Sequence, residues 1–277
     1  MKKSDTRINH STEDYFEIIS VLRRLIKIIL LELRTEVSDL KDIMFLYALA
    51  RASTQIESIL QLWKLKHYSD CLIIYRTQVE RLLTYHYLLD TNTIKDFDDW
   101  SLIQNFENRN RAKSDKAQSP YLTKKFWAES RKRIERYQRL KAQETTWKRP
   151  DSNTLEEIAR KHDLEFFFKY GYKYASGFVH PLSSDGEHEF GLVTGIDPRS
   201  AEEYDTTPIL NNSLIVFILI IELALNESSF EWNEYVFKVI TDCTDYIKDR
   251  TGDYKETMKV VEYMVNTNFK IYKKYAT

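Results

Sequence analysis

The sequence is poor in the residues that tight turns and disulfides require. Its 277 residues include only 6 Gly and 5 Pro, whereas a sheet protein of this size needs many more turns. The scarcity of turn residues therefore favours long helices. The 2 cysteines, Cys71 and Cys243, lie far apart and form no C-x2-C pair, which argues against a disulfide framework and a cysteine-based zinc site.

The distribution of apolar residues indicates neither a secretory signal nor a membrane-spanning segment. Residues 1–16 contain two lysines with no apolar stretch after them. The longest apolar run, Leu214–Leu225, is interrupted by Glu222 and is shorter than the about 20 residues that a spanning helix needs. We expect this run to form a buried core helix, and we expect a cytoplasmic protein without a membrane segment.

The motifs of several enzyme classes do not occur. The chain has no GxxxxGK[ST] phosphate loop, no GxGxxG, no HExxH and no GxSxG, which argues against ATPases, dinucleotide enzymes, zincins and α/β-hydrolases. One short acidic segment has side chains that can bind metals: Asp185, Glu187, His188 and Glu189. Without further ligands from elsewhere in the chain, such a segment is more typical of polar side chains that face solvent. We therefore predict no metal and no cofactor.

What the sequence does contain is helical periodicity with cap residues. Hydrophobic residues make up 43% and charged residues 30%, and apolar residues recur every three or four positions. Ser11 with Asp14, and Asp39, have the positions of N-caps. The pattern predicts an all-α protein, a multi-helix bundle of about eight to ten helices in one domain over 1–277. Helices are predicted from Ser11 to about 36, and over 40–66, 71–90, 94–113, 120–141, 155–178 and 207–226, with two more that are split near 251–252. The helix over 155–178 is either continuous or interrupted at Gly171.

Two breaks interrupt this pattern. Pro150 ends a helix and the residues after it offer new caps, which predicts a hinge near 145–153. Residues 180–207 hold three of the glycines and two of the prolines, and they predict one long irregular loop. Loops longer than about 15 residues are uncommon in compact domains and are often functional.

Positive charge is concentrated between Arg109 and Arg149. That segment has 14 Lys and Arg against 4 Asp and Glu, although the whole chain has a net charge of −1. One interpretation is a surface that contacts RNA phosphates, and the other is a solvated helix that packs against an acidic neighbour in the same protein. The candidate RNA-binding residues are Lys124, Lys125, Arg131, Lys132, Arg136 and Arg139.

Three pairs or groups of residues are candidates for chemistry. Arg76 and Glu80 are four residues apart and share a helix face, where they either form a structural salt bridge or line a polar cleft. Ser176 and His180 also share a face, and Pro181 should end the helix directly after His180. A histidine at a helix C-terminus either caps the last carbonyls or, when protonated, binds phosphate and donates a proton.

The third group, Arg81 and His86, has R-x4-H spacing, which resembles the catalytic motif of HEPN ribonucleases. These are helical domains that dimerise. The resemblance implies a histidine that acts as acid or base on the 2′-hydroxyl and the leaving oxygen, and an arginine that stabilises the charge of the phosphorane.

A second resemblance covers more of the chain. The Arg76-x3-Glu80 pair, the Tyr174-x-Ser176-x3-His180-Pro motif and an intervening tryptophan resemble an uncharacterised group of bacterial all-helical proteins. That group is known only as a domain of unknown function and is distantly similar to HEPN-like domains. The resemblance spans about 48–190 and implies that Arg76, Glu80, Tyr174, Ser176 and His180 form one polar site.

Two functions follow as hypotheses. The first is a HEPN-like RNA-processing or defence-associated effector, a metal-independent ribonuclease that forms a homodimer. In it His180 acts with Arg76 and Glu80, or Arg81 acts with His86, on RNA that the 109–149 segment guides. The second is a non-catalytic helical binding module, in which these residues stabilise the core and the basic helix binds a partner.

Overall fold

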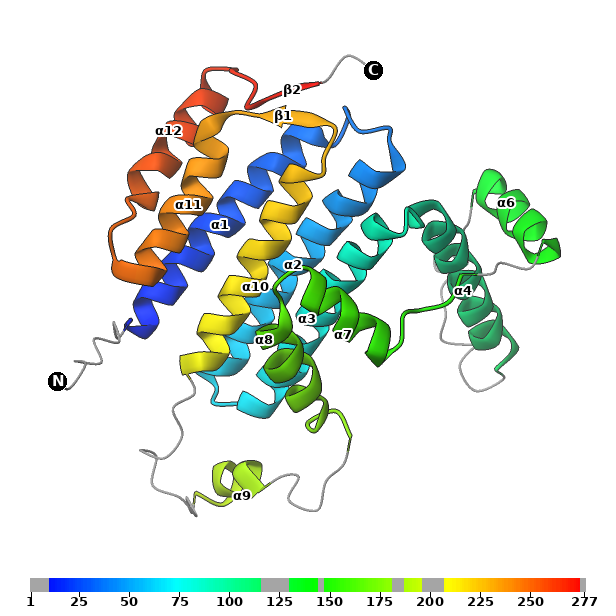
Figure 1. Ribbon diagram of the computed structural model, residues 1–277, viewed down its shortest axis with the longest axis horizontal. Helices are drawn as coiled ribbons and strands as arrows, with labels where there is room; N and C mark the ends of the chain where they lie inside the picture. The colour runs from blue at the N-terminus through cyan, green and yellow to red at the C-terminus, as the bar shows by residue number, and fades with distance from the viewer. Residues whose placement is uncertain (1–9, 116–129, 144–146, 181–186, 196–206, 275–277) are drawn as a thin grey trace. The chain divides into compact units, whose positions relative to one another are not determined.

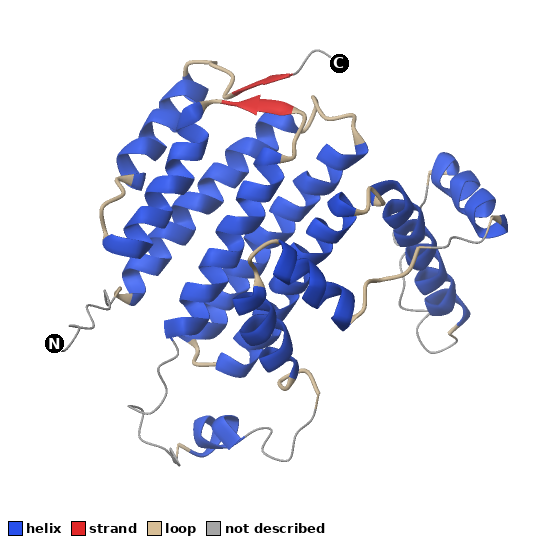
Figure 2. Cartoon of the chain, in the orientation of Figure 1, coloured by secondary structure: helices blue, strands red, loops and turns tan. Residues whose placement is uncertain are grey.

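The computed structural model describes residues 10–115, 130–143, 147–180, 187–195 and 207–274. This part of the chain is almost entirely helical (Figure 2), so the prediction of an all-α fold is confirmed. The chain divides into two compact units: unit 1 comprises residues 1–83 and 155–277, and unit 2 comprises residues 84–154. The second unit ends one residue beyond the predicted hinge, and a single domain over 1–277 stays a prediction.

Unit 1 is built around long helices that lie side by side in Figure 1. Ser11 caps the first helix with the expected capping box to Asp14, and Asp39 caps the second, as predicted. The last long helix before the C-terminal pair, α10, packs against three others, and α12 packs against two. The helices of this group are α1 (Thr12–Leu33), α2 (Leu40–Lys64), the first part of α3 (Tyr68–Asp90), α10 (Thr207–Asn226), α11 (Glu234–Asp249) and α12 (Tyr254–Asn266).

The core of unit 1 contains α10, as the apolar run in the sequence predicts. Leu214, Phe217 and Ile221 have no exposed surface. By length and composition alone, Pro208–Asn226 would suffice to cross a membrane, with a mean hydropathy of 2.1, but 56% of its most apolar stretch is buried inside the protein. A core helix has the same composition, so this finding is weak evidence for a membrane.

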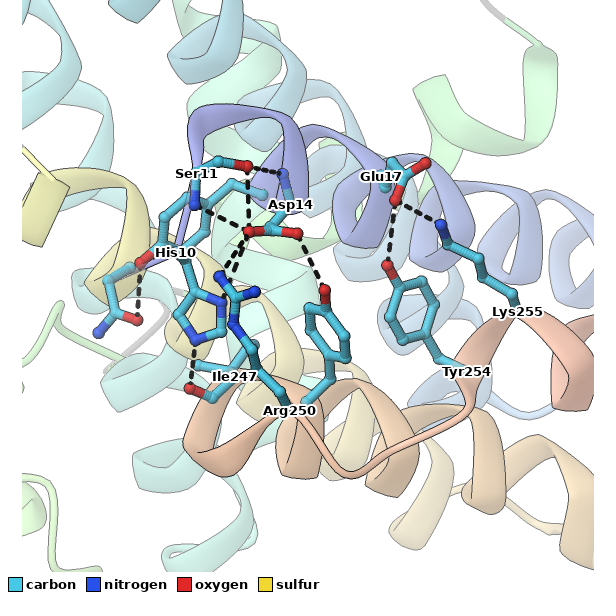
Figure 3. Close-up of polar contacts among 11 residues, drawn as sticks. His10, Ser11, Asp14, Glu17, Ile247, Arg250, Tyr254 and Lys255 are labelled. Atoms are coloured by element: carbon cyan, nitrogen blue, oxygen red, sulfur yellow. Dashed lines mark hydrogen bonds and ion pairs between the residues drawn. The ribbon is translucent and has the colours of Figure 1, made fainter. Parts of the chain in front are cut away.

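A cluster of polar contacts holds the N-terminus of α1 against α11 (Figure 3). The Asp14 carboxylate accepts hydrogen bonds from the Ser11 backbone at 2.8 Å, from the Tyr246 hydroxyl at 2.9 Å and from the Arg250 guanidinium at 3.1 Å. Burial acts to raise the pKa of Asp14, but the hydrogen bonds from Ser11 and Tyr246 and the charge of Arg250 outweigh burial and lower it.

Neighbouring contacts extend the cluster to α12. His10 Nε2 lies 2.7 Å from the Ile247 carbonyl oxygen, and Glu17 accepts hydrogen bonds from the Lys255 ammonium at 2.6 Å and from the Tyr254 hydroxyl at 3.4 Å (Figure 3). We interpret the cluster as structural, because both of its carboxylates are neutralised by cations of the same unit. A short antiparallel pair of strands, β1 (Phe230–Trp232) and β2 (Tyr272–Lys274), was not predicted from the sequence.

Unit 2 contains the end of α3, α4 (Ile94–Ser114) and α6 (Arg131–Ala142). Helix α6 packs against α4 through a small apolar cluster in which the Phe106 and Tyr137 rings stack at 4.5 Å. The other members of that cluster are Leu102, Ile103 and Leu140.

The helix predicted over 155–178 is interrupted, but the break lies before Gly171 rather than at it. It is divided into α7 (Ser152–Lys161), α8 (Glu165–Phe167) and a π-helix, η2 (Phe168–Tyr174). Asp163 has a φ of +56°, and the Leu164 N–H bonds back to the Ala159 carbonyl at 2.7 Å. A left-handed residue followed by this bond is a Schellman motif, which ends a helix, and aspartate adopts this conformation more readily than most residues.

The helix also ends earlier than predicted at its C-terminal side. Ser176 is the last helical residue, and three successive turns lead from it to His180, so His180 is not the C-terminal residue of a helix. Within the predicted 180–207 loop, a short helix, α9 (Glu187–Thr194), is formed, while 181–186 and 196–206 lie outside the described residues.

Candidate functional site

The best-defined polar site in unit 1 is centred on Arg76 of α3. Its Nε donates to the Ser176 hydroxyl at 2.8 Å, and Nη1 donates to Glu80 Oε2 at 3.2 Å. The guanidinium carbon lies 4.6 Å from the centre of the Tyr172 ring, within the range of a cation–π contact. We call these four residues, Arg76, Glu80, Tyr172 and Ser176, the Arg76 cluster.

The Arg76 cluster is only slightly open to solvent. The side chain of Arg76 is 17% exposed and that of Glu80 is 11% exposed. A guanidinium has five N–H donors, and within the described residues three of those of Arg76 have no partner. The cluster therefore holds a guanidinium in a fixed orientation with N–H groups that remain available as donors. Such an arrangement can bind an oxyanion.

The π-helix η2 supplies Tyr172 to the cluster, and Ser176 lies two residues beyond the end of η2. The Ser176 hydroxyl donates to the Tyr172 carbonyl and accepts from Arg76, so it links the end of η2 to α3. Gly171 lies at the contact: a Cβ there would lie 2.6 Å from Val79 Cγ2 and 2.8 Å from the Tyr75 ring. The close approach of η2 to α3 thus requires glycine, and π-helical turns occur frequently at functional sites.

Tyr75 is beside the cluster in the core but is not an acid–base candidate. It is 2% exposed, and burial raises the pKa of its hydroxyl. The hydroxyl therefore stays neutral over the physiological range.

The structure brings together only part of the site that the sequence predicts. Arg76, Glu80 and Ser176 are joined, whereas His180 and Tyr174 are exposed at the outer side of the same segment. Within the described residues, neither forms a hydrogen bond or an ion pair with Arg76 or Glu80. Tyr172 was missed, although its position four residues before Ser176 on a helical segment was a usable signal.

The alternative pair, Arg81 and His86, lies on α3. Arg81 belongs to unit 1 and His86 to unit 2. Both side chains are half-buried, and the Arg81 Nε is buried without a hydrogen-bond partner in the described part of the chain. The two residues are five positions apart on one helix, so they point in different directions.

Comparison with family models gives one match. The model of the family of unknown function DUF5677 matches residues 42–193. This chain belongs to the DUF5677 family. The match includes every member of the Arg76 cluster and His180, from α2 through α9. No curated protein and no solved structure matches the chain.

The DUF5677 region also includes the basic segment. Several of its described basic side chains form ion pairs within unit 2. Arg136 bonds to both Asp98 and Asp99 of α4, with its Nε 3.2 Å from Asp99 Oδ1. This pairing matches the interpretation in which the basic helix packs against an acidic neighbour. Arg131 pairs with Glu135 on its own helix at 2.8 Å.

The remaining RNA-binding candidates of the basic segment are not paired with acidic residues in the described part of the chain. Lys132 and Arg139 are exposed and have no partner among the described residues. Lys124 and Lys125 lie outside the described residues, as does Asp185. In the part of the DUF5677 protein that the structure describes, no group of three or more His, Cys, Asp or Glu side chains is arranged to hold a metal ion.

Proposed function

We propose that the Arg76 cluster is a binding site for an RNA phosphodiester, and that the protein is a HEPN-like, metal-independent ribonuclease. One observation carries the proposal: the Arg76 guanidinium of α3 is held by Glu80 and by two groups, Tyr172 and Ser176, of the segment that continues to the exposed His180. The reaction requires at least a fixed cation and an accessible imidazole that can reach the same phosphate.

The chemistry assigns a role to each group. The 2′-hydroxyl of a nucleotide attacks the adjacent phosphorus, the bond from phosphorus to O5′ breaks, and the products are a 2′,3′-cyclic phosphate and a 5′-hydroxyl. A base removes the proton of the 2′-hydroxyl, and an acid protonates O5′. His180 serves as base or acid, and Arg76 stabilises the additional negative charge on the phosphorane oxygens. Glu80 and Ser176 orient Arg76.

Chain connectivity keeps His180 near the cluster. His180 is four positions after Ser176, and an extended chain of that length spans about 14 Å at most. Turn hydrogen bonds from Gly177, Phe178 and Val179 to residues three positions earlier make the connection shorter than this limit. The proposed reaction requires a change in these turns that brings the imidazole to a phosphate bound by Arg76.

The experiment is a cleavage assay on labelled total RNA with purified full-length protein. We expect cleavage by the wild type and a loss of about 100-fold or more in rate for His180→Ala, since general acid–base groups contribute about 10²–10⁴. His67→Ala is the matched control, because His67 is an exposed histidine of the same unit whose side chain pairs with Asp70 in the described part of the chain. Folding of each variant is checked by its melting temperature.

Further variants test which arginine and histidine act together. Loss of cleavage in a folded His86→Ala or Arg81→Ala, with His180→Ala unaffected, would move the reaction to the R-x4-H pair. Cleavage that persists in all of these variants would overturn the assignment of both sites.

A second candidate function, a non-catalytic binding module, is favoured by one observation. Arg76 is already committed to three groups of its own unit, and His180 makes no bond to it in the described residues. In that case Arg76 only ties η2 to α3. Absence of cleavage together with a lower melting temperature for Arg76→Ala would favour this function.

A further inference from the structure

A row of four aromatic rings, three of them exposed, lies on the segment that carries Ser176. Phe166, Tyr170, Tyr174 and Phe178 follow one another at intervals of four residues, a spacing that keeps side chains on one face of a helical segment. The Phe166 and Tyr170 ring centres are 5.0 Å apart, and those of Tyr174 and Phe178 are 5.6 Å apart. We call these four residues the aromatic row.

Three rings of the aromatic row are exposed and Phe178 is half-buried, whereas the rings on the inner face are covered. Phe166, Tyr170 and Tyr174 are 51%, 44% and 60% exposed, respectively. Phe168 is buried and stacks on Tyr172, which in turn contacts Arg76. Packing against α3 therefore explains the inner rings but not the exposed ones. Large exposed apolar groups that gather in one place mark a binding surface.

Positive charge accompanies the rings. The Lys169 ammonium lies 5.0 Å from the centre of the Tyr170 ring and has no carboxylate partner in the described residues. The Lys173 ammonium lies 4.9 Å from the centre of the Phe168 ring and also bonds to Glu156 at 2.6 Å. Lysine is depleted at the cores of protein–protein interfaces, whereas exposed rings interleaved with cations are typical of surfaces that bind single-stranded nucleic acid.

We infer that the aromatic row is a stacking surface for the unpaired bases of single-stranded RNA. Every base has a π-face that stacks on tyrosine and phenylalanine, so binding tolerates different sequences but requires that the bases be unpaired. The row ends two residues before His180, the histidine of the proposed reaction. The identification of the ligand as RNA rests on the proposed function, and the stacking role of the rings does not.

The test is a binding measurement that does not depend on cleavage. The probe is a fluorescein-labelled, fully 2′-O-methylated single strand of about 12 nucleotides, a length within the range that such surfaces cover. Because it has no free 2′-hydroxyl, it is not cleaved by the proposed reaction. Its anisotropy is followed on titration with full-length protein, alongside the same strand in a duplex.

We expect the single strand to bind more tightly than the duplex, and Tyr170→Ala and Tyr174→Ala each to weaken single-strand binding about 5-fold or more. Tyr174→Phe keeps the ring and should bind as the wild type does. Tyr174→Leu keeps apolar area but not the π-face, and it should bind as weakly as Tyr174→Ala. Tyr263→Ala on α12, which removes another highly exposed tyrosine, is the control and should not change binding.

Three results would overturn the inference. One is single-strand binding that is absent or equal in wild type, Tyr170→Ala and Tyr174→Ala. Another is full binding by Tyr174→Leu, which would indicate a general apolar contact. The third is a dimer in light scattering that these alanine variants dissociate without any effect on RNA binding, which would assign the row to a second copy of the chain. Binding as expected without cleavage of ordinary RNA would overturn only the proposed catalytic function.

Discussion

Arg76 and Ser176, 100 residues apart in the sequence, form a direct hydrogen bond of 2.8 Å between Nε and the hydroxyl. This bond joins α3 to the residue two positions after the π-helix η2, and the ion pair to Glu80 and the Tyr172 ring fix the remaining orientation of the guanidinium. The same contacts serve two purposes: they tie two segments of unit 1 together, and they hold a cation in place for an anion.

Arg76→Ala should lower the free energy of unfolding by about 1–3 kcal/mol, because it leaves the Glu80 carboxylate partly buried without its cation. Adding Glu80→Gln to this variant removes the uncompensated charge and should restore part of the loss. Denaturant unfolding of the wild type, both single variants and the double variant gives the coupling between the two residues. Strictly additive effects would show that the ion pair contributes nothing to stability.

Gly171→Ala should destabilise the protein by about 1–3 kcal/mol, since its Cβ would overlap the buried side chains of Val79 and Tyr75. The usual gain from replacing a helical glycine, about 1 kcal/mol, is too small to compensate. Val79→Ala removes the nearest atom, so the cost of Gly171→Ala measured in that background should be smaller. An equal cost in both backgrounds would contradict the close approach of η2 to α3.

Asp99→Asn should destabilise unit 2 at neutral pH and should have little effect in acid. Burial acts to raise the pKa of Asp99, but hydrogen bonds from Lys95 and Arg136 and the charges of both outweigh burial and lower it. The resulting stabilisation is complete above the pKa of the unfolded chain, about 3.9, and is lost as the pH falls through the lower folded value. Thermal unfolding of both proteins between pH 7 and pH 2 measures this. A difference that does not shrink below about pH 4 would exclude the pairing as its source.

Arg136→Ala and the double variant Lys132→Ala, Arg139→Ala should separate the structural and RNA-binding interpretations of the basic helix. Arg136 bonds to Asp98 and Asp99, so its loss should lower the melting temperature. Lys132 and Arg139 are exposed, so their loss should leave the melting temperature unchanged. If α6 contacts phosphates, the double variant should reduce the dependence of RNA affinity on salt by a slope of about 1–2. An unchanged slope would remove α6 from the RNA-binding surface.

Local signals predicted the helices of unit 1 well, because caps and periodicity depend on neighbouring residues. Ser11 with Asp14, and Asp39, begin helices where their side chains can accept backbone hydrogen bonds. The break at Asp163 escaped prediction because aspartate carries no strong stop signal, and its left-handed conformation is fixed by the packing of the next residue, Leu164.

The candidate site was predictable only in part for a similar reason. The i,i+4 spacing of Arg76 and Glu80 shows that they share a face, and Ser176 entered through the resemblance of its motif. The role of Tyr172 and the position of His180 depend on a π-helix and on the turns after Ser176, and both are set by tertiary contacts such as that of Gly171 with Val79.

The most direct test of the central claim is the identity of the RNA ends after incubation with the wild-type protein. The account predicts fragments that carry 2′,3′-cyclic phosphate and 5′-hydroxyl ends, no cleavage at a position where 2′-deoxyribose replaces ribose, and no such fragments with His180→Ala or Arg76→Ala. Fragments with 5′-phosphate ends, cleavage next to the deoxyribose, or equal cleavage by both variants would contradict it.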